Sequence, residues 1–198
     1  MKALLVAASL CLGAAPALAR DDNPNIDAIW MPQVVSFTYQ AEDTFYTCNS
    51  LWQKVTGILA HLGARKTAPA HRISCDDFAH TVRLQIALES PAAATPENLL
   101  AITDYDSEDL LVARLRGKQL PSASDIPRFP AAWTTLSLRS AEMRLTGGDC
   151  DLVHQLRKQV LPKLSVQVLN EPTRCLPVLS RGGGMAPKMK VRALTVAG

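Results

Sequence analysis

Apolar residues between Cys48 and Cys75 recur at the spacing of one helical face. They are Leu51, Val55, Ile58, Leu59 and Leu62. Residues spaced i, i+4, i+7, i+8 and i+11 share one stripe along an α-helix. Asn49 or Ser50 is suited to cap the start of this helix, and Gly63 suits a left-handed stop. The pattern predicts an amphipathic helix that begins near Cys48 and ends near Gly63.

A similar unit lies between Cys150 and Cys175. A shift of 102 positions places apolar residues of the first helix on apolar residues of the second: Leu51 on Val153, Ile58 on Val160, Leu59 on Leu161 and Leu62 on Leu164. Asp149 is suited to cap this second helix. Pro162 falls inside the apolar pattern, so we expect the helix to kink or end there.

Alternating apolar and polar residues flank both helices, as is typical of half-buried strands. The candidate strands are 34–40, 64–66 and 82–89 in the first half and 134–140, 165–169 and 190–196 in the second. Each half therefore reads β-α-β-β, which predicts an α+β fold of two tandem units and indicates an internal duplication. Chance similarity between two amphipathic helices is the alternative.

The segment between the two units is expected to be a linker that contains a helix. Residues 90–98 and 121–130 are rich in turn-forming residues. Ser107, followed by two acidic residues, marks a helix start. The predicted apolar face of this helix consists of Leu110, Leu111, Val112 and Leu115. The predicted organisation is a signal peptide at 1–19, a first unit at 20–90, a linker with a helix at 91–130 and a second unit at 131–198.

The first 19 residues have the pattern of a secretory signal peptide. Lys2 precedes an apolar run at 3–15, and Ala17-Leu18-Ala19 matches an A-x-A cleavage site, so cleavage is expected after Ala19. The run is shorter than the about 20 apolar residues that span a bilayer, although a retained anchor is the alternative. We expect an exported protein, periplasmic or secreted, whose mature chain has no transmembrane segment.

The mature chain carries four cysteines, and an even count behind a signal peptide indicates two disulfides. Local pairing, Cys48 with Cys75 and Cys150 with Cys175, follows from the repeat, while the other connectivities stay open. A four-cysteine zinc site is the alternative, but zinc sites usually contain closely spaced cysteine pairs, and this chain has none. Without Lys2 the formal net charge falls from +3 to +2, which argues against a nucleic-acid partner.

No catalytic, cofactor or metal site is expected from the motifs. The chain lacks G-x-S-x-G, S-x-x-K, C-x-x-C and the phosphate-binding G-x-x-x-x-G-K pattern. Residues 104–109 begin like a calcium loop, but Asp109 and Leu115 occupy positions that require glycine and glutamate, so a helix cap is favoured. The four histidines, His61, His71, His80 and His154, form no metal motif. A Ser-His-Asp triad that meets only in the fold stays open.

The C-terminal stretch from residue 172 is basic and contains no acidic residue. Its candidate anion-contact residues are Arg174, Arg181, Lys188, Lys190 and Arg192. These side chains can face an anionic envelope component, such as lipid phosphate, an acidic glycan or an acidic protein. The alternative is a solvated edge strand protected by lysine.

The stretch FTYQAEDTFYTCNSLWQKVTGILAHLGAR, with GDCDLVHQLRKQVLPKL later, resembles a set of small uncharacterised secreted proteins of proteobacteria. The shared run is Cys48, Leu51, Lys54, Val55, Ile58, Leu59, Leu62, Gly63, Ala64 and Arg65. The resemblance implies a periplasmic address and no particular activity. We expect a non-enzymatic envelope module that binds an unidentified macromolecule or protein. A periplasmic hydrolase and a secreted enzyme inhibitor are the alternatives.

Overall fold

The structure is a computed structural model that describes residues 24–66, 72–138, 143–170 and 187–198. Over these residues one antiparallel sheet has the strand order β2-β4-β1-β5-β7-β6, and β3 pairs with β4. In chain order the elements are β1 (Ile26–Gln40), α1 (Cys48–His61), β2 (Arg65–Lys66), β3 (Arg72–Ser74), β4 (Thr81–Ala93), α2 (Pro96–Thr103), α3 (Ser107–Leu115), β5 (Phe129–Leu138), η1 (Gly147–Asp149), α5 (Cys150–Gln159), η2 (Leu161–Lys163), β6 (Val166–Val168) and β7 (Met189–Val196). The expected α+β class is confirmed.

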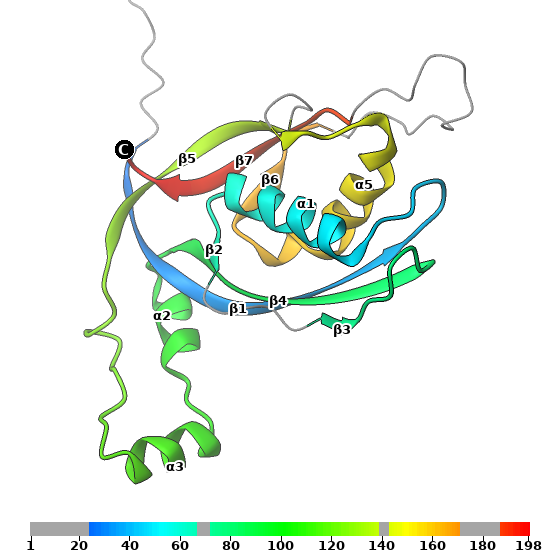
Figure 1. Cartoon of the computed structure of the whole chain (residues 1–198). Coiled ribbons are helices and arrows are strands. Elements are labelled where there is room, and N and C mark those ends of the chain that lie inside the picture. Colours follow the sequence, from blue (N-terminus) through cyan, green and yellow to red (C-terminus); the bar gives the residue numbers. More distant parts are fainter. Residues whose placement is uncertain (1–23, 67–71, 139–142, 171–186) are drawn as a thin grey trace, which may run out of the picture.

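The strand order is symmetric about the β1–β5 pair at the centre of the sheet. Read outward, it is β1, β4, β2 on one side and β5, β7, β6 on the other. The series β1, α1, β2 and β4 in the first half corresponds to β5, α5, β6 and β7 in the second. The two central strands, β1 and β5, pair over three positions, with Asp27 opposite Pro130 in the middle. Beyond this pairing the two strands diverge, and the sheet curves around α1 and α5 (Figure 1).

The core lies between the inner face of this curved sheet and the two helices. The predicted apolar stripe of α1 is confirmed, since Leu51, Val55, Ile58, Leu59 and Leu62 are all buried. It packs in one cluster with alternate residues of the strands, among them Val35, Phe37, Tyr39, Leu84, Ile86 and Leu88, and with Leu152, Val153 and Leu156 of α5. Burial of each large apolar side chain contributes about 1.5–3 kcal/mol, so this cluster supplies most of the driving force for folding.

The start of α1 differs from the prediction. Thr47 is the N-cap, and its hydroxyl accepts a hydrogen bond of 3.2 Å from the Ser50 N–H, so the proposed caps Asn49 and Ser50 are wrong. The prediction was displaced because the apolar pattern begins only at Leu51, whereas the helix already includes Cys48. The end is as predicted, since Gly63 has a φ of +87°.

The second helix ends where the sequence predicts. α5 stops at Gln159, and Pro162 lies in the following turn η2. Asp149 occupies the N-cap position, but its side chain makes no capping hydrogen bond to α5. Its carboxylate instead accepts from the main chain and hydroxyl of Thr146, which precedes η1. Asp149 is therefore at the predicted cap position, but its side chain does not make the expected capping hydrogen bond.

Strand β1 is 15 residues long and begins eight residues before the predicted strand. Pro32 and the polar residues around it hid the first part of the strand. The proline is tolerated because the main-chain N–H and C=O groups of odd-numbered residues in β1 point toward β4. The Asp27 carbonyl, for example, accepts a hydrogen bond from Ala94 N–H. Pro32 is even-numbered, so its nitrogen points toward the opposite edge of β1. The lack of an N–H group there removes no hydrogen bond between β1 and β4.

The segment between the halves forms an arm of two helices that projects from the sheet (Figure 1). The predicted linker 90–98 is wrong in part, because residues 90–93 complete β4 and Pro96 opens α2. Helix α3 begins at Ser107 as predicted, and Asp106 caps it by accepting from Asp109 N–H. The predicted apolar face of α3 is largely exposed, because the arm projects away from the hydrophobic core.

Candidate functional site

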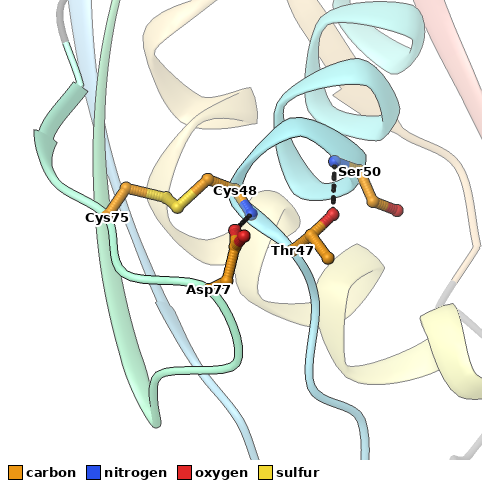
Figure 2. Close-up of a disulfide and its surroundings, with 5 residues drawn as sticks. All are labelled: Thr47, Cys48, Ser50, Cys75 and Asp77. Carbon is orange, nitrogen blue, oxygen red and sulfur yellow. Dashed lines mark hydrogen bonds between the residues drawn. A yellow bond between two sulfur atoms is a disulfide. The ribbon is translucent and has the colours of Figure 1, made fainter.

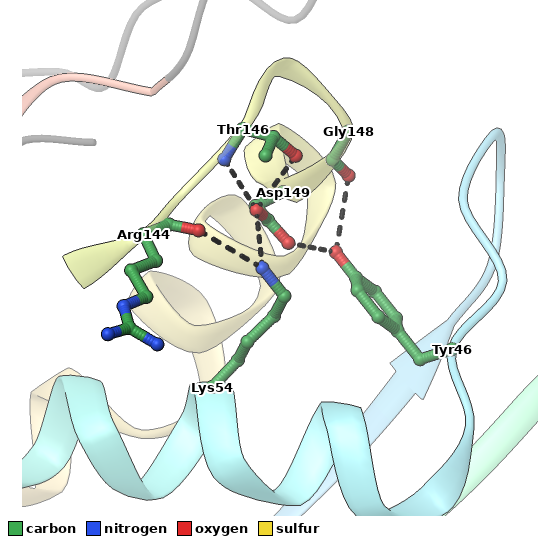
Figure 3. Close-up of polar contacts among 6 residues, drawn as sticks. All are labelled: Tyr46, Lys54, Arg144, Thr146, Gly148 and Asp149. Atoms are coloured by element: carbon green, nitrogen blue, oxygen red, sulfur yellow. Dashed lines mark hydrogen bonds and ion pairs between the residues drawn. The ribbon is translucent and has the colours of Figure 1, made fainter. Parts of the chain in front are cut away.

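A buried carboxylate connects the two halves of the chain. Asp149 is 1% exposed, and its oxygens accept hydrogen bonds from Lys54 Nζ at 2.8 Å and from Tyr46 Oη at 2.5 Å. The Thr146 main-chain N–H donates to the same carboxylate at 2.6 Å. Figure 3 shows that Lys54 rises from α1 and that Tyr46 comes from the segment before it. This polar cluster of Tyr46, Lys54, Thr146 and Asp149 therefore joins α1 to the turn that starts α5.

The pKa values of Asp149 and Tyr46 are both shifted away from neutral pH. Burial raises the pKa of Asp149, but hydrogen bonds from Lys54 and Tyr46 outweigh burial and hold the pKa below its ordinary value. Burial, together with the hydrogen bond to Asp149, raises the pKa of Tyr46 far above its ordinary value. A general acid or base works best with a pKa near the working pH, so neither group is suited to proton transfer near pH 7. The polar cluster is a structural connection.

Two glutamines on successive turns of α5 hold that helix to the edge of β1. Gln159 accepts from Thr38 N–H at 2.9 Å and donates to the Thr38 carbonyl at 2.8 Å. Gln155 makes the same pair of bonds with Gln40, at 2.8 and 2.7 Å. Each side-chain amide makes the pair of hydrogen bonds that the backbone of a neighbouring strand would otherwise make. The main-chain groups of Thr38 and Gln40 are satisfied in this way at the end of β1, where the strand no longer pairs with β5.

The predicted disulfide between Cys48 and Cys75 is confirmed, with an S–S distance of 2.04 Å (Figure 2). It joins the first residue of α1 to the segment between β3 and β4. Asp77 accepts a 2.7 Å hydrogen bond from Cys48 N–H, so this carboxylate helps to satisfy the start of α1. Cys150 is buried at the start of α5. Its predicted partner Cys175 lies outside the described residues, and that pairing stays a prediction.

Aromatic rings and arginines gather on the face of the sheet opposite the helices. We call this the outer face, formed by Trp30, Arg65, Arg83, Phe129, Trp133, Lys190 and Arg192, which alternation and strand pairing place opposite the main-core residues. The rings of Trp30 and Phe129 stack with centroids 4.9 Å apart. The Arg65 guanidinium carbon lies 3.9 Å from the Trp30 ring centroid, and that of Arg192 lies 5.8 Å from Trp133. Such cation–π contacts hold both cations over aromatic surface.

The two tryptophans occupy equivalent positions around the centre of the sheet. Trp30 and Trp133 each follow the central pair, Asp27 and Pro130, by three residues. Each belongs to one half of the chain, and each has an arginine over its ring. Three buried side chains pack with Phe129 and Trp133: Ala28 of β1, Ala131 of β5 and Leu194 of β7. The outer face is therefore one continuous surface across the two halves.

The candidate anion-contact residues fall partly on this outer face. Lys190 and Arg192 lie on β7 beside Trp133, and Lys188 is exposed just before the strand. Arg174 and Arg181 lie outside the described residues. Arg83 adds a further exposed cation on β4. Glu89, the acidic residue of this face on β4, forms an ion pair with Arg65. Cations thus exceed acidic groups on the outer face.

The surroundings of His61 and His80 contain no nucleophile among the contacts that the structure describes. His61 lines a hollow of about 370 Å³ together with Gln53, Lys54, Gly57, Met143 and Arg144. A nucleophile and a general base must lie within hydrogen-bond reach of each other, and these lining residues include no serine, threonine or cysteine. His80 instead packs edge-on against the Phe45 ring, with centroids 4.9 Å apart. His71 lies outside the described residues.

Within the part of the chain that the structure describes, no three His, Cys, Asp or Glu side chains are grouped to hold a metal ion. No helix among those residues has the length and apolar character needed to span a membrane. Comparisons of the chain with protein-family models, with curated proteins and with solved structures found no match. The sequence had given no signal for the polar cluster or for the paired tryptophans, because the first half carries two tryptophans, Trp30 and Trp52, and only the fold shows which of them matches Trp133.

Proposed function

We propose that this protein is a non-catalytic binding module of the bacterial cell envelope, and that its outer face binds an acidic envelope component. The predicted signal peptide at 1–19 and the Cys48–Cys75 disulfide both favour an exported address. We further propose that residues 20–90 and 131–198 are two copies of one β-α-β-β unit. Apart from β3, which has no counterpart among the described residues of the second half, the two halves share one element order, and this order together with the symmetric strand order supports the duplication.

The observation that carries the proposal is the matched pair of tryptophan–arginine contacts on the outer face. Residues at these positions fill no part of the main core, which lies on the other side of the sheet. Tryptophan and arginine are the side chains most enriched among residues that dominate binding energy. Here one such pair from each half stands beside the β1–β5 junction. A ligand that crosses the junction would therefore contact equivalent groups twice.

The charge of the outer face selects an acidic ligand. Arg83 and Lys190 are exposed cations of this face, and Glu89, its acidic residue on β4, pairs with Arg65. Aromatic rings flanked by cations suit a polymer with flat apolar surfaces and regularly spaced anionic groups. An acidic glycan has both features. The net charge of the chain is only +3, so the attraction is proposed to come from the local cations of the outer face and not from the chain as a whole.

Replacing Trp30 and Trp133 together with alanine is expected to weaken binding of an acidic polysaccharide at least tenfold. Loss of a tryptophan at the centre of an interface typically costs about 2 kcal/mol, and 1.4 kcal/mol corresponds to a factor of ten. The measurement is isothermal titration calorimetry with polygalacturonate, and vesicles of phosphatidylglycerol distinguish a glycan from a lipid phosphate.

Two controls make this titration decisive. Dextran, a neutral polysaccharide, should give no heat of binding. Arg114→Gln, on the exposed arm, should bind polygalacturonate as the unmodified chain does. If neither acidic probe binds the unmodified chain, or if the tryptophan variant binds equally well, the proposed binding surface is wrong.

A further inference from the structure

The arm formed by α2 and α3 exposes an unusual amount of apolar surface. Figure 1 shows both helices projecting from one end of the sheet. Four of their leucines are more than half exposed: Leu100 at 69%, Leu110 at 52%, Leu111 at 55% and Leu115 at 78%. We call these four residues the leucine patch. Several large apolar side chains exposed on two neighbouring helices can mark an interaction site.

The leucine patch is arranged to receive another helix. Leu111 and Leu115 are one turn apart on α3, which places both on the same side of the helix. Ala113, on the opposite side, is the buried residue of α3. The exposed side chains therefore face away from the arm's own interior. A second amphipathic helix laid along α3 would cover them.

The charges of α3 indicate which helix that is. Glu108 and Asp109 lie in its first turn, and Arg114 lies in its last turn, followed closely by Arg116 and Lys118. A helix that is acidic at its start and basic at its end is complementary to a copy of itself running in the opposite direction. An interface between two identical subunits related by a two-fold axis requires this self-complementarity.

The same charges make a membrane surface an unsuitable occupant. Residues 91–130 contain six acidic and four basic side chains. Bacterial membrane surfaces are anionic and attract segments rich in lysine and arginine. An anionic membrane surface repels a segment with excess acidic charge. The leucines of the arm would have to approach that surface in order to insert. The charge of the arm thus favours a protein partner.

We propose that the leucine patch binds the leucine patch of a second copy of this chain, with the two α3 helices antiparallel. Leu111 and Leu115 of each copy then pack at the centre. Glu108, which lies one turn before Leu111 on the same side of α3, is then near Lys118 of the other copy. The contact leaves the outer face of each copy free, so this proposal stands or falls separately from the proposed binding function.

Sedimentation equilibrium of the full mature chain tests the proposal. The unmodified chain is expected to dimerise in the micromolar range, as interfaces of small area do. Leu111→Asp and Leu115→Asp should each raise the dimer dissociation constant at least tenfold. Leu169→Asp is the matched control, because Leu169 is 51% exposed but lies outside the arm, next to β6. It should dimerise normally.

A charge exchange provides a second, independent readout. Glu108→Arg places like charges opposite each other and should weaken the dimer, and adding Lys118→Glu should restore it. Circular dichroism checks that each variant is folded. The proposal is overturned if the unmodified chain is monomeric at about 100 µM, if the leucine variants dimerise as the control does, or if the charge exchange fails to restore association.

Discussion

Replacing Asp149 with alanine is expected to lower the free energy of unfolding by about 3 kcal/mol, which is a large part of the stability of a typical domain. The variant leaves the Lys54 ammonium and the Tyr46 hydroxyl without the carboxylate that they both contact. The Lys54 side chain is only 22% exposed, so water compensates for little of this loss. Urea unfolding at pH 7, followed by circular dichroism, measures the effect.

The pH dependence of the free energy of unfolding shows whether Asp149 stabilises the protein through its ionised carboxylate or through packing alone. The pKa of Asp149 in the folded protein lies below its ordinary value, which is about 3.9 in an unfolded chain. Its stabilising contribution is therefore complete above about pH 4 and is lost as the pH falls toward the folded-state pKa. The stability difference between the unmodified chain and Asp149→Asn should be constant from about pH 5 to 8 and shrink below about pH 4.

The control for this position is Asp104→Asn, since Asp104 is an exposed carboxylate on the arm. It should unfold at the same urea concentration as the unmodified chain. If Asp149→Ala is as stable as this control, the polar cluster does not connect the halves as described. A stability difference that persists unchanged below pH 3 would show that packing rather than charge is responsible.

Removing the confirmed disulfide with Cys48→Ala and Cys75→Ala together is expected to cost about 3–4 kcal/mol. The bond closes a loop with a sequence separation of 27 residues, and the cost arises because the unfolded chain regains the entropy that the loop had lost. The bond also holds α1 against the sheet at the residue where the helix begins. Thermal and urea unfolding of the double variant measure the loss.

The unmodified chain, unfolded in the presence of a reductant, provides the comparison for this variant. Reduction should lower its stability by at least as much as the double substitution does, because reduction acts on every disulfide present. A double variant with the stability of the oxidised chain would mean that the helix and sheet hold this region without the bond.

Local periodicity predicted the parts of the fold that depend on neighbouring residues. The apolar stripe of α1 and the alternation of Val82, Leu84, Ile86 and Leu88 gave the correct buried faces. Strand β1 was too short in the prediction because Pro32 breaks the alternation of its first part. Such a proline is acceptable only at an unpaired edge, and edge position is a property of the assembled sheet.

The polar contacts between the halves could not be predicted, because their members are far apart in the sequence. Tyr46 and Asp149 are separated by 103 positions, and Gln159 bonds to a strand residue 121 positions away. From the sequence alone Asp149 was equally suited to cap the helix that follows it. Its actual role depends on where the fold places Lys54. The same applies to Trp30 and Trp133, which become neighbours of one junction only when β1 pairs with β5.

The most direct test of the proposed binding function is a titration of the ¹⁵N-labelled protein with polygalacturonate, monitored at the indole N–H signals. The chain has three tryptophans, and Trp52 on α1 is an internal reference away from the outer face. We predict that the Trp30 and Trp133 signals shift together with added ligand while Trp52 stays in place. Unchanged Trp30 and Trp133 signals at saturating ligand, or a shift of Trp52 alone, would contradict the assignment of binding to the outer face.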